Sequence, residues 1–411
     1  MTSHHPLPRH AATPPSLHES TFGVGELFFS RTDPAGIMQS GNAVFQRVSE
    51  YSWDELIGRP HKLIRHPGTP RAVFHLLWQT IKAGRPIGAY VQNKARSGAF
   101  YWVYAVVTPI REGYLSVRLK PVSDLVPRIK ALYAAHAEME RKSGCTPAES
   151  AALLLDEIRG LGFPDYGAFS AAALARELNA RADALSRDRD AMTGCLNEVS
   201  VLTRSILLLS DATHRSYAAL KLAPMNISLE ASRAGQAGIP TGVVARNYQM
   251  LAGELNDVLT AFVVAANELG ESVNKSLFLA GTAALQREMH AVFDGERGGG
   301  GSTRAADMAI LHEQQGAYFS MASASLDDVA RARTAFVRSC TAMGRLVSAL
   351  EVMRVMGKVE WARVGVSSGH MDALLSQFGA FQTELRDTLR KLDGLNKDLG
   401  LLATQALAAA A

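Results

Sequence analysis

Residues 58–78 read G-R-P-H-K-L-I-R-H-P-G-T-P-R-A-V-F-H-L-L-W, and this stretch decides how the first part of the chain folds. Its three prolines exclude a continuous helix and hold the backbone extended or turned. The pattern predicts a helix directly after them, with Thr69 as its N-cap and Gly84 at its end. One face of this helix carries Phe74, Leu77, Trp78 and Ile81. A rigid polar loop that leads into a helix with an aromatic face can form one wall of a ligand pocket.

The segments on either side of this loop predict a small α+β domain over residues 25–121. Asn42 is placed to cap one short helix, and residues 52–55 (S-W-D-E) form a capping-box pattern for a second. The strand-like segments are 27–31, 37–39, 87–94, 100–110 and 114–119. Two strands, several short helices and three further strands predict a five-stranded antiparallel sheet with helices on one face. Such a layer leaves a cleft between sheet and helices.

The composition of the chain limits the classes of protein to which it can belong. The 411 residues are 47% hydrophobic and 20% charged, which is typical of a folded protein with two or three domains. A net charge of +4 is too small to indicate nucleic-acid binding. The three cysteines lie far apart and show no metal-ligand spacing, so we expect a reducing compartment and no metal site.

The ends and the hydropathy of the chain give further expectations. Residues 1–24 are rich in proline and histidine and contain no apolar run, which predicts a disordered tail and excludes a signal peptide. No window approaches about 18 consecutive apolar residues, so we expect no membrane span and a cytoplasmic protein. We find no phosphate-binding loop, no nucleophile–histidine–acid set and no kinase or cyclase signature, so the protein is not expected to be an enzyme.

Residues 122–176 are predicted to form a helical connector. The segment 124–142 has apolar residues at helical spacing and would leave the last strand as a signalling helix. Thr146 begins a second capped helix, which ends before the break at 160–164.

Residues 177–293 are predicted to form a long antiparallel helical hairpin. A seven-residue apolar repeat, typical of a coiled coil, runs through Leu178, Leu185, Met192, Val199, Ile206, Thr213 and Leu220. Pro224 should interrupt the first arm, close to the bend. Two helices alone have too little core, so the hairpin needs a partner, most simply a second copy of the chain.

The last part of the chain is predicted to be a second helical unit. A Gly-rich linker at 294–304 precedes it, and residues 305–411 contain two long helices, 305–363 and 370–410. These helices are alternative partners that would complete the bundle with the hairpin.

Several segments in residues 25–121 resemble one sensor family. They are T-D-P-A-G-I, N-A-V-F-Q-R-V-S-E-Y-S-W-D-E-L-I-G-R-P-H-K-L-I-R-H-P, V-Q-N-K-A-R-S-G-A-F-Y-W-V and L-S-V-R-L-K-P. These segments resemble the PAS domain of Aer-type aerotaxis receptors, and the resemblance implies a PAS fold and a pocket for FAD. The resemblance implies the flavin contacts Asn42, Arg65, His66, Trp78 and Asn93.

The chemistry of three of these residues suits a flavin. Asn93 can donate to and accept from a ring edge, Arg65 can oppose a pyrophosphate or an anionic ring, and Trp78 can stack on a flat heterocycle. Gly68 stands where the family usually has an acid. Two alternatives stay open. A haem would need a neutral imidazole, for which His61, His66 and His75 are candidates. A PAS domain without a cofactor would serve only to dimerise.

The bend of the hairpin carries a second resemblance. Residues 225–245 read M-N-I-S-L-E-A-S-R-A-G-Q-A-G-I-P-T-G-V-V-A, which is similar to a degenerate form of the tip of methyl-accepting chemotaxis proteins. The resemblance implies that Asn226, Glu230 and Arg233 contact other receptors, the chemotaxis histidine kinase and its coupling protein. No paired-glutamate methylation segment is present.

Together these patterns predict a soluble, homodimeric sensor of redox state or oxygen that signals in aerotaxis through a helical bundle. The alternatives are a haem-based gas sensor and a cofactor-free scaffold of chemoreceptor arrays.

Overall fold

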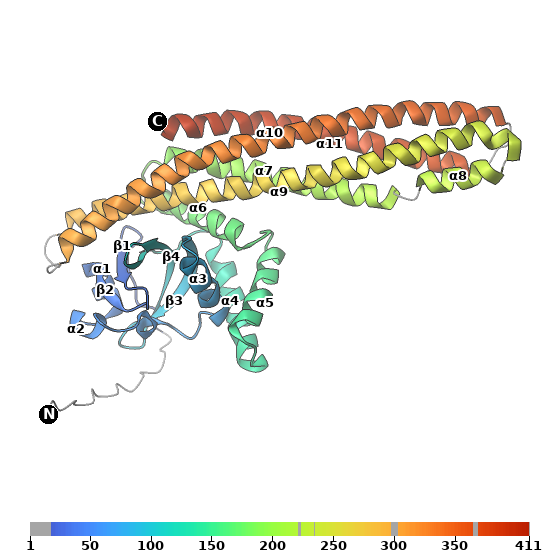
Figure 1. Cartoon of the computed structure of the whole chain (residues 1–411). Helices are drawn as coiled ribbons and strands as arrows, with labels where there is room; N and C mark the ends of the chain where they lie inside the picture. The colour runs from blue at the N-terminus through green and yellow to red at the C-terminus, as the bar shows by residue number, and fades with distance from the viewer. Residues whose placement is uncertain (1–17, 221–222, 234, 297–302, 365–368, 411) are drawn as a thin grey trace. The chain divides into compact units, whose positions relative to one another are not determined.

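The computed structural model describes residues 18–220, 223–233, 235–296, 303–364 and 369–410 (Figure 1). The chain forms two compact units, one of residues 1–193 with 277–322 and the other of residues 194–276 with 323–411. This division falls inside the helices α9 (Ile239–Gly295) and α10 (Arg304–Val364) and not at the predicted linker. Most of that linker, and residues 1–17 of the predicted tail, lie outside the described residues.

The first unit contains the predicted five-stranded antiparallel sheet. Its strands are β1 (Leu27–Thr32), β2 (Met38–Gly41), β3 (Ile87–Lys94), β4 (Phe100–Ile110) and β5 (Gly113–Leu119). They lie in the order β2-β1-β5-β4-β3, with every neighbouring pair antiparallel. The prediction of the sheet is therefore confirmed, and β1 and β5 lie side by side at its centre.

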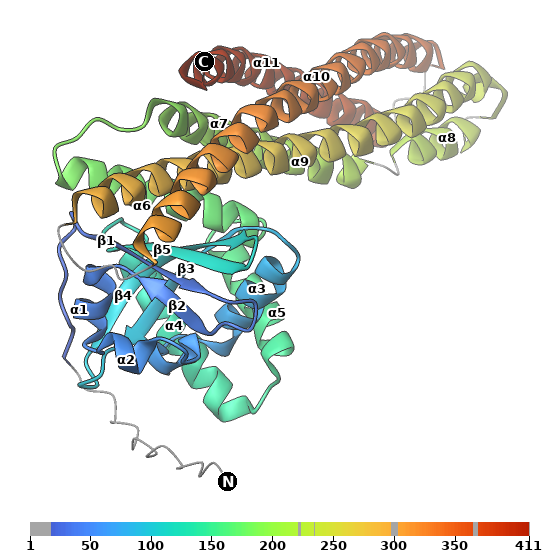
Figure 2. The same ribbon diagram turned by 60° about the vertical axis from the view of Figure 1, so that its left-hand side comes forward.

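The short helices between β2 and β3 cover one face of this sheet (Figure 2). They are α1 (Ala43–Ser49), α2 (Trp53–Leu56), η1 (His61–Ile64) and α3 (Arg71–Lys82). The capping predictions for the first two are confirmed, because the Asn42 side chain accepts from Phe45 N and Glu55 closes the capping box with Ser52.

Helix α3 begins later than predicted, and Thr69 is not its N-cap. The cap position is Pro70, and the Thr69 hydroxyl instead accepts from Gln92 N at 2.8 Å and donates to Gln92 O at 3.0 Å. The backbone N–H groups of Arg71 and Ala72 donate to the Glu140 carboxylate at 2.9 and 3.0 Å. The Glu140 carboxylate, from a later helix, therefore caps the N-terminus of α3, the role that the sequence pattern predicted for Thr69.

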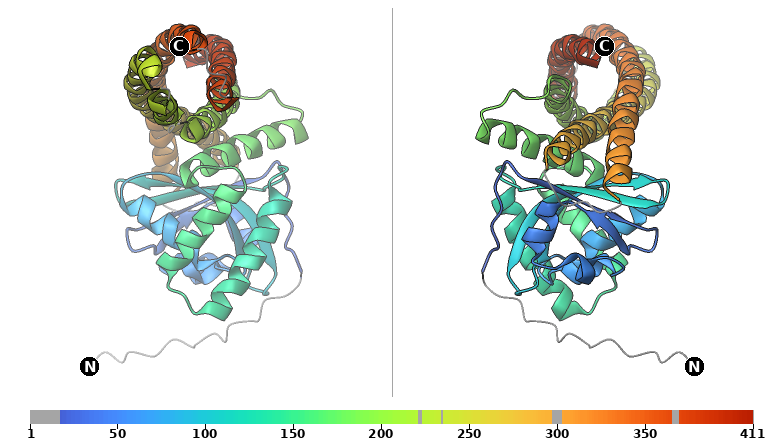
Figure 3. Two further views of the ribbon diagram at one scale, coloured as in Figure 1. Left: turned by 90° about the vertical axis from the view of Figure 1, so that its right-hand side faces the viewer. Right: turned by 90° about the vertical axis from the view of Figure 1, so that its left-hand side faces the viewer.

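The opposite face of the sheet is covered too, by helices from later in the chain. These are α4 (Val126–Ser143), α6 (Tyr166–Ala184) and parts of α9 and α10, whereas α5 (Pro147–Gly160) packs against α3. Side chains alternate along β4, so Trp102 packs 6.0 Å from Tyr133 of α4, and Tyr104 donates to Ser170 O of α6 at 2.8 Å. Figure 3 shows α6, in green, on the other side of the sheet from the blue helices.

A buried carboxylate holds α6 to the end of the sheet domain. Glu177 is fully buried and accepts from Tyr90 Oη at 2.6 Å and from Ser123 Oγ at 2.6 Å. It also accepts from the backbone N–H groups of Val122 and Ser123 at 2.7 and 3.0 Å. The segment that leaves β5 is therefore fixed where it enters α4.

Residues 18–24 do not belong to a disordered tail, so that part of the prediction is wrong. Ser20 N donates to Phe100 O at 2.7 Å, and Phe100 N donates to His18 O at 3.0 Å. Phe22 is buried, with its ring 5.4 Å from that of Phe28. Pairing with the start of β4 and the burial of one aromatic ring hold this segment on the domain.

The second unit is a bundle of long helices (Figure 1). Its elements are α7 (Ala191–Leu220), α8 (Ala223–Arg233), η2 (Gly235–Gly238), most of α9 and α10, and α11 (Gly369–Ala410). Pro224 lies in the first turn of α8, and the predicted interruption of the first arm falls at residues 221–222, which lie outside the described residues. One continuous apolar core contains Ile206, Phe262, Phe336 and Leu385, from four different helices. The helices α10 and α11 therefore supply within the chain the partner that the hairpin needs.

The predicted coiled-coil repeat starts too early. Leu178 lies in α6 and Leu185 follows its end, and a non-helical stretch separates them from α7. The repeat contributes to the bundle only from Val199 onward, because the earlier repeat positions, Met192 included, belong to the first unit. Among the helices that the structure describes, none combines the length and the apolar character that crossing a membrane requires.

Candidate functional site

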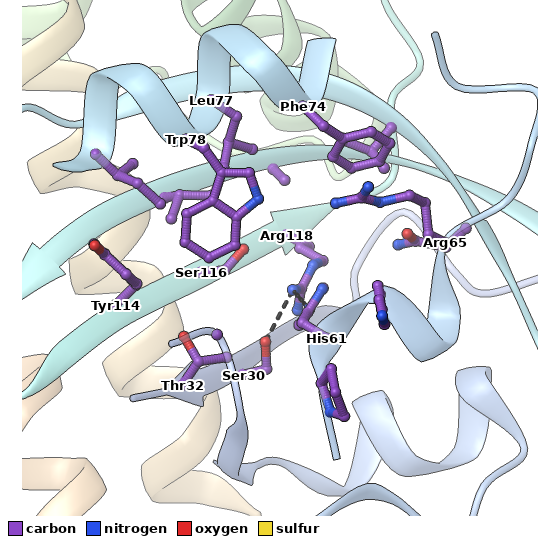
Figure 4. A pocket seen from close by; sticks show the side chains of 18 of the residues that line it. Ser30, Thr32, His61, Arg65, Phe74, Leu77, Trp78, Tyr114, Ser116 and Arg118 are labelled. Atoms are coloured by element: carbon purple, nitrogen blue, oxygen red, sulfur yellow. Dashed lines mark hydrogen bonds between the residues drawn. The ribbon is translucent and has the colours of Figure 1, made fainter. Parts of the chain in front are cut away.

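A cavity of about 210 Å³ lies between α3 and the sheet (Figure 4). Its walls come from β1, η1, α3 and the three strands β3 to β5. An apolar protein cavity of about 150 Å³ is known to hold benzene. The cavity therefore has room for a flat ring system.

Aromatic and aliphatic side chains line one side of the cavity. Trp78 of α3 and Tyr114 of β5 meet edge to face, with ring centroids 5.7 Å apart, and Phe74 and Leu77 continue the apolar wall. Gly36 has φ +80°, and a Cβ there would lie 2.8 Å from Cη2 of Trp78. The turn needs glycine both for its left-handed backbone and for space beside the indole.

A buried arginine that has no carboxylate partner among the described residues lies on the other side of the cavity. Arg118 of β5 is 2% exposed, and its Nη2 donates to Ser30 Oγ at 2.9 Å. Its guanidinium carbon lies 5.6 and 5.4 Å from the ring centroids of Phe28 and Phe45. Burial lowers the pKa of Arg118 to about 10, so the group still carries its charge at neutral pH.

His61 lies against this arginine and is neutral. The distance between His61 Nε2 and Arg118 Nη2 is 2.6 Å. Burial, followed by the positive charges of Arg118 and Arg65, lowers the pKa of His61 well below its ordinary value. Because a guanidinium can only donate, His61 Nε2 accepts and the imidazole proton lies on Nδ1.

Three residues that line the cavity each have a buried polar atom without a hydrogen-bond partner among the residues that the structure describes. These atoms are Asn93 Nδ2, Ser116 Oγ and Arg118 Nη1. Buried polar atoms are almost always paired, so an unpaired set on one cavity calls for an explanation. All three can donate a hydrogen bond. The lining also contains the cations Lys62, Arg65 and Arg118 and no carboxylate, so it suits a ligand rich in acceptors or negatively charged.

The predicted residue Arg65 lies at the edge of this cavity. Its guanidinium carbon is 3.5 Å from the centroid of the Phe74 ring, and burial lowers its pKa. The backbones of Arg65 and Asn93 form an antiparallel bridge, which places both side chains on the same cavity. Figure 4 shows the Arg65 guanidinium beside Phe74. The structure therefore brings together Arg65, Trp78 and Asn93 of the predicted set.

Asn42 is not at the cavity, contrary to the prediction from the resemblance. Its Oδ1 accepts from Phe29 N at 3.2 Å and Phe45 N at 3.4 Å. Its Nδ2 donates to Leu27 O at 3.1 Å and to Glu296 Oε1 at 2.6 Å. The carboxamide is fully used in joining β1, α1 and the end of α9, so its role is structural.

His66 does not line the cavity either. Its Nδ1 accepts from Gly68 N at 2.9 Å, and its ring lies 5.9 Å from that of Phe100. Burial lowers the pKa of His66. A Cβ at Gly68 would lie 2.1 Å from Gln92 Oε1, so the acid usual in the resembled family would require the end of the Gln92 side chain to move.

The sequence held a signal for the missed residues Ser116 and Arg118. They lie two positions apart in β5, so their side chains share one face of the strand. An arginine at an inward position of an apolar strand is the feature that would have identified this site. Ser30, Phe74 and Tyr114 carry no such signal, because only the sheet pairing and the position of α3 bring them to the cavity.

The predicted partner residues lie in α8 of the second unit. Asn226 and Arg233 are exposed, and Arg233 Nη1 donates to Glu230 Oε1 at 2.5 Å. Their role in binding other proteins stays a prediction.

Comparison with known proteins agrees with the fold of the first domain. Residues 40–116 match the PAS fold family. The chain is 37% identical over 111 residues to the aerotaxis receptor of Escherichia coli (strain K12), covering 26% of this chain and 22% of that protein. It is 28% identical over 96 residues to the nitrogen fixation regulatory protein of Klebsiella pneumoniae, covering 23% and 19%. The chain thus spans about a fifth of the length of these curated relatives, at 22% and 19%.

A solved structure that is similar to the chain is the light state of the blue-light photoreceptor Aureochrome1 LOV. The identity is 18%, the match covers 26% of this chain and 88% of that chain, and the TM-score is 0.23. The family match over residues 40–116 and the identity to the aerotaxis receptor show that the first unit contains a PAS domain related to that of the receptor. These matches do not show the resemblance of residues 225–245 to a chemoreceptor tip.

Proposed function

We propose that the chain is a PAS-based sensor of redox state or oxygen that holds FAD in the cavity beside α3. One observation carries the proposal: the cavity presents three unpartnered hydrogen-bond donors and three cations, with no carboxylate in its lining. The relationship of the PAS domain to that of the aerotaxis receptor supports the same conclusion.

The residues of the cavity fit a flavin. An isoalloxazine ring is flat, with an apolar edge and an opposite edge of carbonyl oxygens and ring nitrogens. Trp78, Phe74 and Leu77 suit the apolar part, and Asn93, Ser116 and Arg118 suit the polar edge. Lys62 is exposed where it lines the cavity and can oppose phosphate groups. When bound, the flavin supplies reversible electron transfer and absorption of visible light.

Arg118 is the residue through which the charge of the ligand acts on the protein. Its free Nη1 is available to the ligand, and its Nη2 is held by Ser30 of β1. The neutral His61 accepts from the same guanidinium and adds no second charge. A change in charge on the polar edge of the ligand therefore changes the electrostatic attraction between the ligand and Arg118. Because Arg118 is hydrogen-bonded to Ser30, this change also acts on β1.

The geometry favours a flavin over a haem. Of the three candidate imidazoles, His61 lines the cavity and His66 and His75 are not in its lining. The Nε2 of His61 is occupied by the Arg118 donor, so it is not available as an axial ligand.

The absorption spectrum of the purified full-length chain tests the proposal. We expect flavin bands, and release of one FAD per chain on denaturation. The variant Asn93→Ala should lose bound flavin, and the control Asn396→Ala, in α11 of the second unit, should keep it. A Soret band would identify a haem sensor. Protein that stays colourless after incubation with FAD would contradict the proposal.

We propose that the output is non-enzymatic and acts through the helical bundle on other chemoreceptors, the chemotaxis histidine kinase and its coupling protein. Exposed Asn226 and Arg233 on α8 support this output. Co-sedimentation with kinase and coupling protein, together with kinase activity in oxidising and reducing buffer, tests it. A chain that joins such arrays without changing kinase activity would instead be a scaffold. The closed core formed with α10 and α11 favours that second candidate, because the hairpin does not depend on a second copy.

A further inference from the structure

The ends of two long helices pack on the first unit. We name the described parts of residues 277–322 the helical base, because they comprise the end of α9 and the start of α10 that belong to this unit. The side chain of Asp307 in the base is 2% exposed. It accepts from Arg31 Nε at 2.9 Å and from Ser40 Oγ at 2.8 Å. A nearly buried acid thus joins α10 to the strands β1 and β2.

Two further contacts hold the base on the same strands. Glu296 accepts from Asn42 Nδ2 at 2.6 Å and from Ala43 N at 3.3 Å. The Phe293 ring meets the Phe29 ring edge to face, with centroids 4.9 Å apart. The base is therefore fixed by an ion pair, a second carboxylate and an aromatic contact, which together make a specific docking surface.

The strand β1 is the wall between this docking surface and the cavity. Its side chains alternate, so Ser30 and Thr32 line the cavity and Phe29 and Arg31 face the base. Ser30 holds Arg118, and the next residue, Arg31, holds Asp307. Adjacent residues of one strand therefore carry the contact to the ligand site and the contact to the helices.

We propose that docking of the helical base and filling of the cavity stabilise each other, so that the base is the output contact of the PAS domain. This inference rests on the proposed function, in which the cavity takes a ligand. The docked base holds β1 in place, and so holds Ser30 and Arg118 ready for the ligand. A site that is ordered beforehand binds more tightly, because less motion is lost on binding.

Helix α4, which leaves the sheet directly, is less suited to this role. Ser123, in the segment between β5 and α4, donates to Glu177, and neither residue lines the cavity. The base contacts β1 instead, beside a residue that holds Arg118.

The affinity of the full-length chain for FAD tests the coupling. The variant Asp307→Asn removes the charge that holds Arg31, and it should weaken FAD binding at least about fivefold, since coupling between sites is commonly that large or larger. The control Glu313→Gln changes an exposed acid on the same helix and should bind FAD as the wild type does. If Asp307→Asn does not fold, Glu296→Gln provides the same comparison.

Hydrogen exchange gives the reciprocal measurement, because linkage acts equally in both directions. Adding FAD to the wild-type chain should slow amide exchange in residues 304–322, and this slowing should be reduced in Asp307→Asn. Equal FAD affinity in the two proteins, with no change of exchange in 304–322, would overturn the inference while the flavin proposal stands. A wild-type chain that binds no FAD would overturn the proposed function, and the inference with it.

Discussion

The Nη2 atom of Arg118 lies 2.6 Å from Nε2 of His61, so two basic side chains meet at the cavity without an acid between them. The pKa of Arg118 stays high enough for the arginine to remain charged, whereas the pKa of His61 is lowered, which favours the neutral imidazole. In the part of the chain that the structure describes, one positive charge thus has no compensating acid, and Nη1 of the same arginine has no hydrogen-bond acceptor. A buried charge without a partner is costly, so a ligand that brings negative charge, as we propose, would stabilise this pair.

Replacing Arg118 with methionine separates ligand binding from folding. Arg118→Met keeps an unbranched apolar side chain in place of the arginine stem and removes the unpaired charge, so the ligand-free chain should be as stable as the wild type or more stable. FAD affinity should fall at least about tenfold, because one charge-assisted hydrogen bond is lost. Fluorescence titration and urea unfolding measure the two effects. Arg111→Met, at an exposed turn, is the control and should change neither. Wild-type affinity in Arg118→Met would exclude Arg118 from the site.

The free energy of unfolding should fall as the pH falls below about 6.5, the ordinary pKa of histidine. The pKa of His61 in the folded state lies well below that value, so only the unfolded chain takes up this proton. The stabilisation is therefore complete above pH 6.5 and is lost toward lower pH, by up to about 1.4 kcal/mol per pH unit for one group.

Denaturant unfolding at a series of pH values between neutral and mildly acidic measures this slope. His66, whose pKa is also lowered, contributes with the same sign, so His61→Gln should reduce the slope without abolishing it. A slope unchanged by His61→Gln would show that His61 is protonated in the folded chain.

Two asparagines that the resemblance places in the site should behave differently. Asn42→Ala removes a side chain that makes four hydrogen bonds in a buried position, so it should destabilise the chain by about 1–3 kcal/mol. Asn93→Ala removes a carboxamide whose Nδ2 makes no hydrogen bond to any described residue, so it should mainly weaken FAD binding. Thermal unfolding and FAD titration of both variants provide the comparison. The assignment of Asn93 to the site is wrong if its variant loses stability and keeps its affinity.

Removal of the Glu177 carboxylate should loosen the junction of β5, α4 and α6. Glu177→Ala leaves donors of Tyr90, Val122 and Ser123 without their acceptor, at a cost of about 3 kcal/mol. Glu138→Ala breaks surface ion pairs with Arg141 and Lys142 and should cost less than about 1 kcal/mol. Urea unfolding of the two variants checks the difference, and equal costs would contradict the role of Glu177 as a clamp.

Local patterns were sufficient where neighbours in sequence decide the structure. Alternating Val, Tyr and Trp predicted the strands, and the capping signals of Asn42 and Ser52 are present in the structure. Thr69 shows the limit of such patterns. Its hydroxyl can cap a helix, yet Gln92 of a later strand takes it and Glu140 of a later helix replaces it.

The candidate site could be predicted only in part. Arg65, Trp78 and Asn93 line the cavity as expected, whereas Asn42 and His66 are used by the fold. A motif shows which residue types are present, but it does not show whether their hydrogen-bonding atoms are already taken. That depends on groups such as Glu296, which is far from Asn42 in sequence.

The amino-acid sequence by itself determined the order of strands and helices, the sheet of the PAS domain and the extent of the two last helices, because periodicity and capping act over a few residues. Only the tertiary structure decided that Arg118 is buried without a counter-charge among the described residues, that α10 and α11 pack in the bundle core, and that Asp307 docks on β1. Each of these features depends on groups from distant parts of the chain. In a buried position, the free energy of a polar or charged group depends strongly on whether such a partner is present.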